Sequence, residues 1–154
     1  MKKDFTRDYV TEIFRAYAAA GMPTYDNERE RIYQEELTRR AAMDAETAVI
    51  QAEIATEART PYLLDILAAE KTMELLERGN KAVVVRAVKE IYCAYPTRPL
   101  RRGDLTDRVR RFSLLCPADT STVYRWLKEA RLLCAAVRGL RISDEDIKKY
   151  HIAL

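Results

Sequence analysis

Apolar residues recur at helical spacing along most of the chain, and short breaks separate the patterned segments. An advance of about 100° per residue brings the apolar positions of each segment onto one side of a helix. The four glycines and five prolines fall almost entirely between these segments or at their ends. The pattern therefore predicts an all-α protein, with helices over residues 4–20, 27–42, 44–58, 60–78, 81–95, 104–116, 121–137 and 144–150.

The helix pair over residues 104–137 has the clearest division between an apolar and a polar face. Thr120 and Ser121 are candidate N-caps of the second helix, because a hydroxyl accepts from free amides of the first turn. The residues expected on its buried side are Val123, Trp126, Leu127, Ala130, Leu133, Cys134 and Val137. The residues on the opposite side are Ser121, Arg125, Lys128 and Leu132, flanked by Thr122, Tyr124 and Glu129. One face is expected to pack, which leaves a face of hydroxyls and cations that suits phosphates and guanine edges.

The first helix of this pair is expected to begin with Asp104 as its cap and to end before Pro117. Arg110 and Arg111 fall outside its apolar stripe, which consists of Leu105, Val109 and Phe112. The preceding segment 81–95 supplies a third helix, so residues 80–142 read as a three-helix helix-turn-helix domain. Proline 117 stands where this motif favours glycine, which leaves two registers open. In the usual twenty-residue frame of the motif, the apolar positions are occupied by Phe112, Cys116, Ala118, Val123 and Trp126. The alternative is a longer turn, in which the apolar positions are counted from Leu105 and Val109.

The N-terminal part, residues 1–79, is expected to form a separate helical region. Its segment 44–58 is expected to be held by Val49, Ile50 and Ile54. The segment 60–78 is apolar over more than one face in its first half, which indicates either the core of a monomer or a buried contact with a second chain. Residues 60–78 are therefore a candidate homodimer interface. Residues 143–154 complete the chain as a short helix and tail.

Composition and charge narrow the classes of function. The chain of 154 residues is 48% hydrophobic and 33% charged, and it has no apolar run long enough to span a membrane and no signal-peptide core at residues 1–9. Its three cysteines lie in apolar patterns and read as buried thiols in a reducing compartment, so a cytoplasmic protein is expected. Residues 1–80 carry 11 Lys+Arg and 16 Asp+Glu, whereas residues 81–154 carry 16 and 8. This split favours a basic nucleic-acid-binding module attached to an acidic one.

Catalysis has little support in the sequence. The only histidine is His151, close to the C-terminus, so a nucleophile–histidine pair would have to use it. The sequence contains no glycine-rich phosphate loop and no Cys/His cluster at zinc spacing. We therefore expect no enzyme, no cofactor and no metal site.

The run from Arg98 to Ile142, and TSTVYRWLKEAR within it above all, resembles small phage and prophage regulators of Gram-positive bacteria. These are the RinA- and ArpU-like late-gene activators, whose C-terminal region is similar to the helix-turn-helix with which sigma-factor region 4 reads the −35 element. The resemblance covers roughly the last third of the chain. It implies sequence-specific binding of duplex DNA near a promoter, with Thr122, Arg125 and Lys128 at recognition positions.

These observations predict a transcription regulator whose second helix lies in the major groove. The expected base contacts are Ser121, Thr122, Tyr124, Arg125 and Lys128. The expected contacts with the DNA backbone are Arg98, Arg101, Arg102, Arg110, Arg111 and Arg131. Two other functions stay open: a DNA-packaging protein similar to a phage terminase small subunit, and an adaptor whose basic face binds an acidic protein. RNA polymerase is a candidate partner of the regulator and also of the adaptor.

Overall fold

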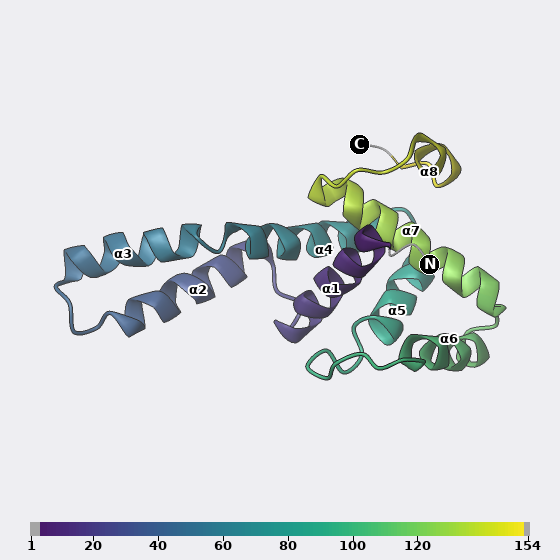
Figure 1. Cartoon of the computed structure of the whole chain (residues 1–154), viewed down its shortest axis with the longest axis horizontal. Coiled ribbons are helices and arrows are strands. Elements are labelled where there is room, and N and C mark those ends of the chain that lie inside the picture. The colour runs from purple at the N-terminus through teal and green to yellow at the C-terminus, as the bar shows by residue number, and fades with distance from the viewer. Residues whose placement is uncertain (1–3, 153–154) are drawn as a thin grey trace.

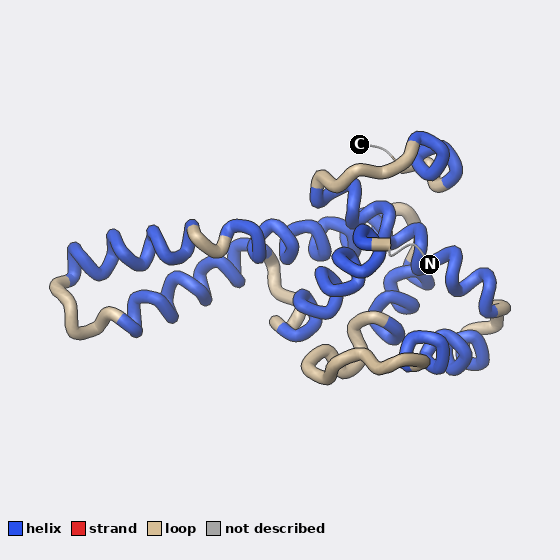
Figure 2. Tube along the Cα trace, in the orientation of Figure 1, coloured by secondary structure: helices blue, strands red, loops and turns tan. Residues whose placement is uncertain are grey.

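The computed structural model describes residues 4–152, and within this range the chain forms eight helices and no strand. The predicted all-α class is confirmed (Figures 1 and 2). The helices are α1 (Phe5–Ala19), α2 (Tyr25–Arg39), α3 (Ala45–Glu57), α4 (Thr60–Arg78), α5 (Ala82–Ile91), α6 (Asp104–Leu115), α7 (Thr120–Arg138) and α8 (Asp144–Lys149). The last two residues of the predicted tail 143–154 lie outside the described range.

Five helices share one hydrophobic core, which forms the body of the molecule. Helices α4 and α7 pack against each other more extensively than any other pair, and α1 crosses both (Figure 1). The core extends without interruption from α1 and α4 into α5, α6 and α7. The boundary expected after residue 79 therefore does not separate two packing units, because α4 contributes to the same core as α5, α6 and α7. Large, fully buried side chains of this core are Ile13, Phe14, Ile66, Ile91, Val109 and Phe112.

The segment 60–78 owes its broad apolar surface to its place in this body. As α4 it packs against α1, α2, α5 and α7, so several of its faces are covered within one chain. Its buried residues are Leu63, Ile66, Ala68, Ala69, Thr72, Met73 and Leu76. The sequence left two explanations open for the apolar surface of this helix: the core of a monomer or a contact with a second chain. Packing within the monomer accounts for this surface without a second chain.

Helices α2 and α3 form a hairpin that projects from the body, here called the arm (Figure 1). Helix α3 turns its small residues Ala48, Ala52 and Thr56 towards α2. The expected anchors of this segment are wrong: Val49, Ile50 and Ile54 are 38%, 52% and 65% exposed. Helix α3 packs extensively only against α2, and close approach of α2 and α3 selects the face with small side chains.

A buried carboxylate joins the arm to the body. Glu28 of α2 is 1% exposed and accepts hydrogen bonds from Arg31 Nε, at 2.6 Å, and from the Tyr62 hydroxyl of α4. Burial by itself would raise the pKa of Glu28, but the two hydrogen bonds outweigh it and hold the pKa below its ordinary value. Burial and the neighbouring carboxylate together raise the pKa of Tyr62 to about 12. At neutral pH the link is therefore a charged acceptor with two donors.

A buried arginine organises the segment between α5 and α6. The Arg15 guanidinium of α1 is 4% exposed and donates to the backbone carbonyls of Tyr92, at 2.9 Å, Tyr95, at 3.1 Å, and Arg98. These carbonyls lie at the C-terminal end of α5 and in the following loop, where the negative end of the helix dipole favours a cation. Arg15 thereby fixes the path by which the chain enters α6.

Two of the three cysteines are buried, and their reactivity can be tested directly. Burial raises the pKa of Cys93 and of Cys134 to about 12, so at pH 8 nearly all of both thiols stay protonated. Cys116, between α6 and α7, is only half-buried. Because the thiolate is the reactive form, we expect one thiol to react readily with Ellman's reagent in the native protein and all three in urea. Cys116→Ser should remove the fast reaction, and fast reaction of two or more native thiols would contradict the assignment.

Candidate nucleic-acid interface

Helix α7 begins with an aspartate cap. Asp119 accepts hydrogen bonds from the Thr122 amide, at 2.8 Å, and from the Ser121 hydroxyl, at 3.0 Å. These bonds hold the pKa of Asp119 below its ordinary value, so the cap is charged at neutral pH. The expected caps Thr120 and Ser121 are wrong, because a carboxylate one residue earlier in the chain already occupies this place. Ser121 is thus partly engaged, through its hydroxyl, in holding the helix start.

Helix α6 begins after Gly103, which adopts a left-handed conformation with φ of 89°. Asp104, expected as the cap, is the first helical residue, and its carboxylate accepts from the Arg101 amide at 2.8 Å. The link from α6 to α7 spans residues 116–119. The Ser113 hydroxyl closes it by donating to the Ala118 carbonyl at 2.5 Å. The link therefore keeps α6 and α7 in a fixed relation.

The apolar residues of both proposed registers contact the core. Val109, Phe112 and Val123 are buried, and the partly buried residues packed against them include Leu105, Cys116, Ala118 and Trp126. The rings of Phe112 and Trp126 meet edge to face, with centroids 6.4 Å apart. Helices α5, α6 and α7 thus pack pairwise as a three-helix unit, in which the short link 116–119 joins α6 to α7.

The buried face of α7 changes along the helix. Val123, Leu127, Ala130 and Cys134 are buried as expected. Val137 is exposed, contrary to expectation, and Ala135 is buried in its place. The reason is that α7 packs against α5 and α6 as well as against α4 and α1, so its covered side is not a single straight stripe.

The first two turns of α7 carry most of the exposed side chains that the sequence predicted for a recognition helix. Ser121, Tyr124 and Arg125 are exposed, whereas Thr122 is half-buried. Lys128, one turn further on, is also half-buried, because its ammonium group lies 3.6 Å from the Asp146 carboxylate. The ammonium group also lies 5.8 Å from the centre of the Tyr150 ring. Helix α8 and its flanking residues therefore partly cover the expected contact surface at Lys128.

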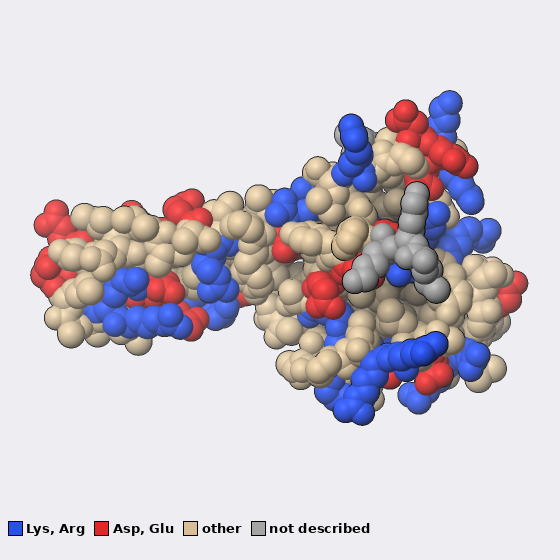
Figure 3. Space-filling model, viewed as in Figure 1, with Lys and Arg blue, Asp and Glu red and all other residues tan. Residues whose placement is uncertain are grey.

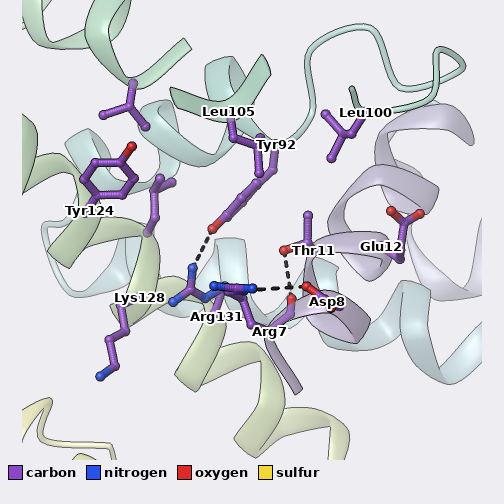
Figure 4. Close-up of a pocket in the computed structure, with 12 residues that line it drawn as sticks. Arg7, Asp8, Thr11, Glu12, Tyr92, Leu100, Leu105, Tyr124, Lys128 and Arg131 are labelled. Atoms are coloured by element: carbon purple, nitrogen blue, oxygen red, sulfur yellow. Dashed lines mark hydrogen bonds and ion pairs between the residues drawn. The ribbon is translucent and has the colours of Figure 1, made fainter. Parts of the chain in front are cut away.

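Tyr124, Lys128 and Arg131 line a groove between α1, α6 and α7, with a volume of about 510 Å³ (Figure 4). Its base is apolar, and Arg7 of α1 lies on its far wall together with Asp8 and Glu12. Arg131 donates to the Tyr92 hydroxyl at 2.9 Å. The Arg131 side chain therefore points into this groove, where the Tyr92 hydroxyl accepts its hydrogen bond. Tyr124 and Lys128 lie at the edge of the groove (Figure 4).

The remaining expected backbone contacts fall at separate places. Arg98 and Arg101 line one hollow in the loop before α6. Arg102 and Arg110 are exposed. Arg111 lines a different groove, between α5 and α6. Basic side chains lie over the body, along the arm and at α8, with acidic ones at the tip of the arm and at α8 (Figure 3). The arginines expected to contact the DNA backbone do not form one strip.

The sequence did not anticipate the positions of three further arginines. Arg15 holds the loop before α6, and Arg108 donates to the Ile91 carbonyl at 2.8 Å, which fixes α6 to the end of α5. Arg7 reaches the groove beside α7 from the other end of the sequence. A signal for Arg15 existed in its position between the apolar residues Ile13, Phe14 and Tyr17, which is unusual for a charged side chain.

The described residues offer neither a cluster of metal-ligating side chains nor a helix suited to crossing a membrane. They include no cluster of three or more His, Cys, Asp or Glu side chains that could hold a metal ion. Across residues 4–152, no helix combines the length and apolarity needed to cross a membrane. Comparisons of the chain with protein-family models, with curated proteins and with solved structures found no match.

Proposed function

We propose that the protein binds double-stranded DNA sequence-specifically through the three-helix unit α5–α7 and acts as a transcription regulator rather than as an enzyme. The observation that carries the proposal is the exposed start of α7. Two turns that bear a hydroxyl, a phenol and a guanidinium face solvent, while the opposite side of the same helix is anchored in the core. A helix of this kind can enter the major groove, where the base edges distinguish all four base pairs.

In this proposal Arg125 makes the principal base contact. Its side chain is exposed on the second turn of α7 and can bond both acceptors of a guanine edge. Thr122, Tyr124 and Lys128 contact bases or adjoining phosphates, and Lys128 does so after exchanging Asp146 for the duplex. Arg101, Arg102 and Arg110 neutralise phosphates. Arg131 is left out of this set because its guanidinium donates to the Tyr92 hydroxyl. Arg111 is left out because it faces the groove between α5 and α6, to which α7 contributes no residue.

The finer assignment, a phage or prophage regulator with a sigma-like helix-turn-helix, rests on the residues 98–142 that resemble such proteins. It adds the expectation that the target lies near a promoter and that RNA polymerase is a partner. In this assignment the acidic residues of the arm and the basic residues of the body bind different macromolecules. The difference in charge between the two halves of the chain favours this division.

The proposal is tested by fluorescence anisotropy with a pool of random duplexes, followed by selection of enriched sequences. We expect log affinity to fall with log salt concentration at a slope of about −4 to −6, as neutralisation of some five or six phosphates requires. A selected motif should then bind more tightly than the pool. Absence of binding at low salt would refute the proposal and favour an adaptor with a protein partner.

Arg125→Ala should weaken binding of the selected motif by about 1–3 kcal/mol and relax the preference at one base pair. The matched control is Arg39→Ala, which removes one positive charge from an exposed side chain on the arm. The control should bind with the affinity and the preference of the unmodified protein. Normal affinity together with normal discrimination in Arg125→Ala would show that another residue reads the base.

A further inference from the structure

The outer face of α3 combines exposed apolar side chains with carboxylates. With about 100° between successive residues, the carboxylates fall between Val49 on one side and Ile50 and Ile54 on the other. We call this surface the α3 stripe; it consists of Glu46, Val49, Ile50, Glu53, Ile54 and Glu57. Within residues 4–152 Glu46 and Glu53 make no ion pair, and Glu57 pairs with Arg29 at 2.9 Å. The fold leaves this stripe open to solvent on a projecting arm (Figure 1).

The α3 stripe is poorly suited to pairing with its own copy. In a two-fold contact the same surface appears on both sides, so carboxylates of one stripe would lie against those of the other. The row occupied by Glu46, Glu53 and Glu57 runs through the middle of the stripe and could not be moved to the rim. Like charges brought together in this way oppose association. The stripe instead suits an apolar surface that carries positive charge.

Such a surface exists at the groove between α5 and α6. Its volume is about 460 Å³, and its apolar part comes from Ala94, Tyr95, Phe112 and Leu115. Tyr95 and Leu115 are 59% and 68% exposed, which is unusual for large apolar side chains. Lys89, Arg108 and Arg111 line the same groove, with Glu90 as its single acidic residue. We call this surface the α5–α6 groove.

We propose that the α3 stripe of one molecule docks in the α5–α6 groove of a second copy of the same chain. Ile50 and Ile54 would cover Tyr95 and Leu115, and the carboxylates of the stripe would face the cations of the groove. Both surfaces are exposed in the isolated chain, so docking requires no rearrangement of the core. Apolar cover and opposite charge thus act together at one contact.

The contact must form between molecules. Helix α3 lies in the arm and α6 lies at the far end of the body, so the stripe and the groove of one chain cannot meet (Figure 1). Each molecule then has one free stripe and one free groove. A contact between unlike surfaces continues into a chain or closes into a ring. None of the residues of the stripe or the groove belongs to the surface of α7 that the DNA-binding proposal uses, although the groove lies on α5 and α6 of the same three-helix unit.

The experiment uses two full-length variants and sedimentation velocity without nucleic acid. Ile50→Ser with Ile54→Ser disables the stripe, and Arg111→Glu with Leu115→Ser disables the groove. All four positions are exposed, so both variants should fold and melt like the unmodified protein. We expect the unmodified protein to associate as its concentration rises, into a reciprocal dimer, a larger ring or a chain, and each variant alone to remain a monomer.

The decisive sample is the equimolar mixture of the two variants. One variant keeps its groove and the other keeps its stripe, so the mixture should form a one-to-one dimer that does not grow further. Dimerisation of the groove variant alone would show an arm-to-arm contact and overturn the proposal. An unmodified protein that stays monomeric throughout the micromolar range would also overturn it. Anisotropy with DNA on the stripe variant, which leaves α5, α6 and α7 unchanged, tests the DNA-binding proposal separately.

Discussion

Replacing Arg15 with methionine is expected to lower the free energy of unfolding by about 2–4 kcal/mol. Methionine fills much of the same volume, but it donates no hydrogen bond to the carbonyls of Tyr92, Tyr95 and Arg98. Acceptors left without donors in a covered position are costly, and the end of α5 also loses the cation that its dipole favours. Urea denaturation followed by circular dichroism measures the change.

The control for this substitution is Arg7→Met, on the same helix. The Arg7 side chain is exposed and its ion pair with Asp8, at 3.5 Å, is a surface contact. Substitution there should alter the free energy of unfolding by no more than about 0.5 kcal/mol. Equal unfolding midpoints for the two variants would show that the loop before α6 holds its path without Arg15.

Glu28→Gln is expected to cost about 1.5–3 kcal/mol at neutral pH, because glutamine replaces a charged acceptor of two hydrogen bonds by a neutral one. The folded-state pKa of Glu28 lies below its ordinary value, so the carboxylate stabilises the fold above that ordinary pKa. This contribution is lost as the pH falls through the folded-state pKa. The difference between the two proteins should therefore be full at pH 7 and shrink steadily in acid.

Urea denaturation at a series of pH values between 7 and the acid limit of the fold gives this difference. Glu30→Gln serves as the control, since Glu30 is an exposed residue of the same helix. It should show little difference from the unmodified protein at any pH. A Glu28→Gln effect that stayed constant from neutral to acid pH would indicate a loss of packing rather than of a charge.

The helices themselves could be predicted because their signals are local. Apolar spacing and the breaks at Gly21, Pro23, Gly79 and Pro117 placed all eight, with ends within a few residues of those observed. Caps were less accurate, since several hydroxyl and carboxylate residues compete at each helix start. Asp119, rather than Thr120 or Ser121, caps α7 because its carboxylate accepts from the Thr122 amide.

The arrangement of the helices could not be read from the same pattern. Ile50 and Ile54 look like core residues in the sequence, yet they are exposed because α3 packs extensively only against α2. Arg15 and Glu28 look like surface charges, yet both are buried against partners far along the chain. The start of α7 was anticipated as an exposed face, but the cover that α8 gives to Lys128 depends on the folded tail.

Helix α4 joins the arm to the body, because it packs against α2 and also against α1, α5 and α7. Its first turn holds α2 through the bond from Tyr62 to Glu28, and its later turns pack against α5 and α7. With 19 residues it is about 28 Å long, and no flexible linker interrupts it. Helix α4 therefore works as a rigid lever. In the proposed complex with DNA, a partner bound to the arm would also set the orientation of α7.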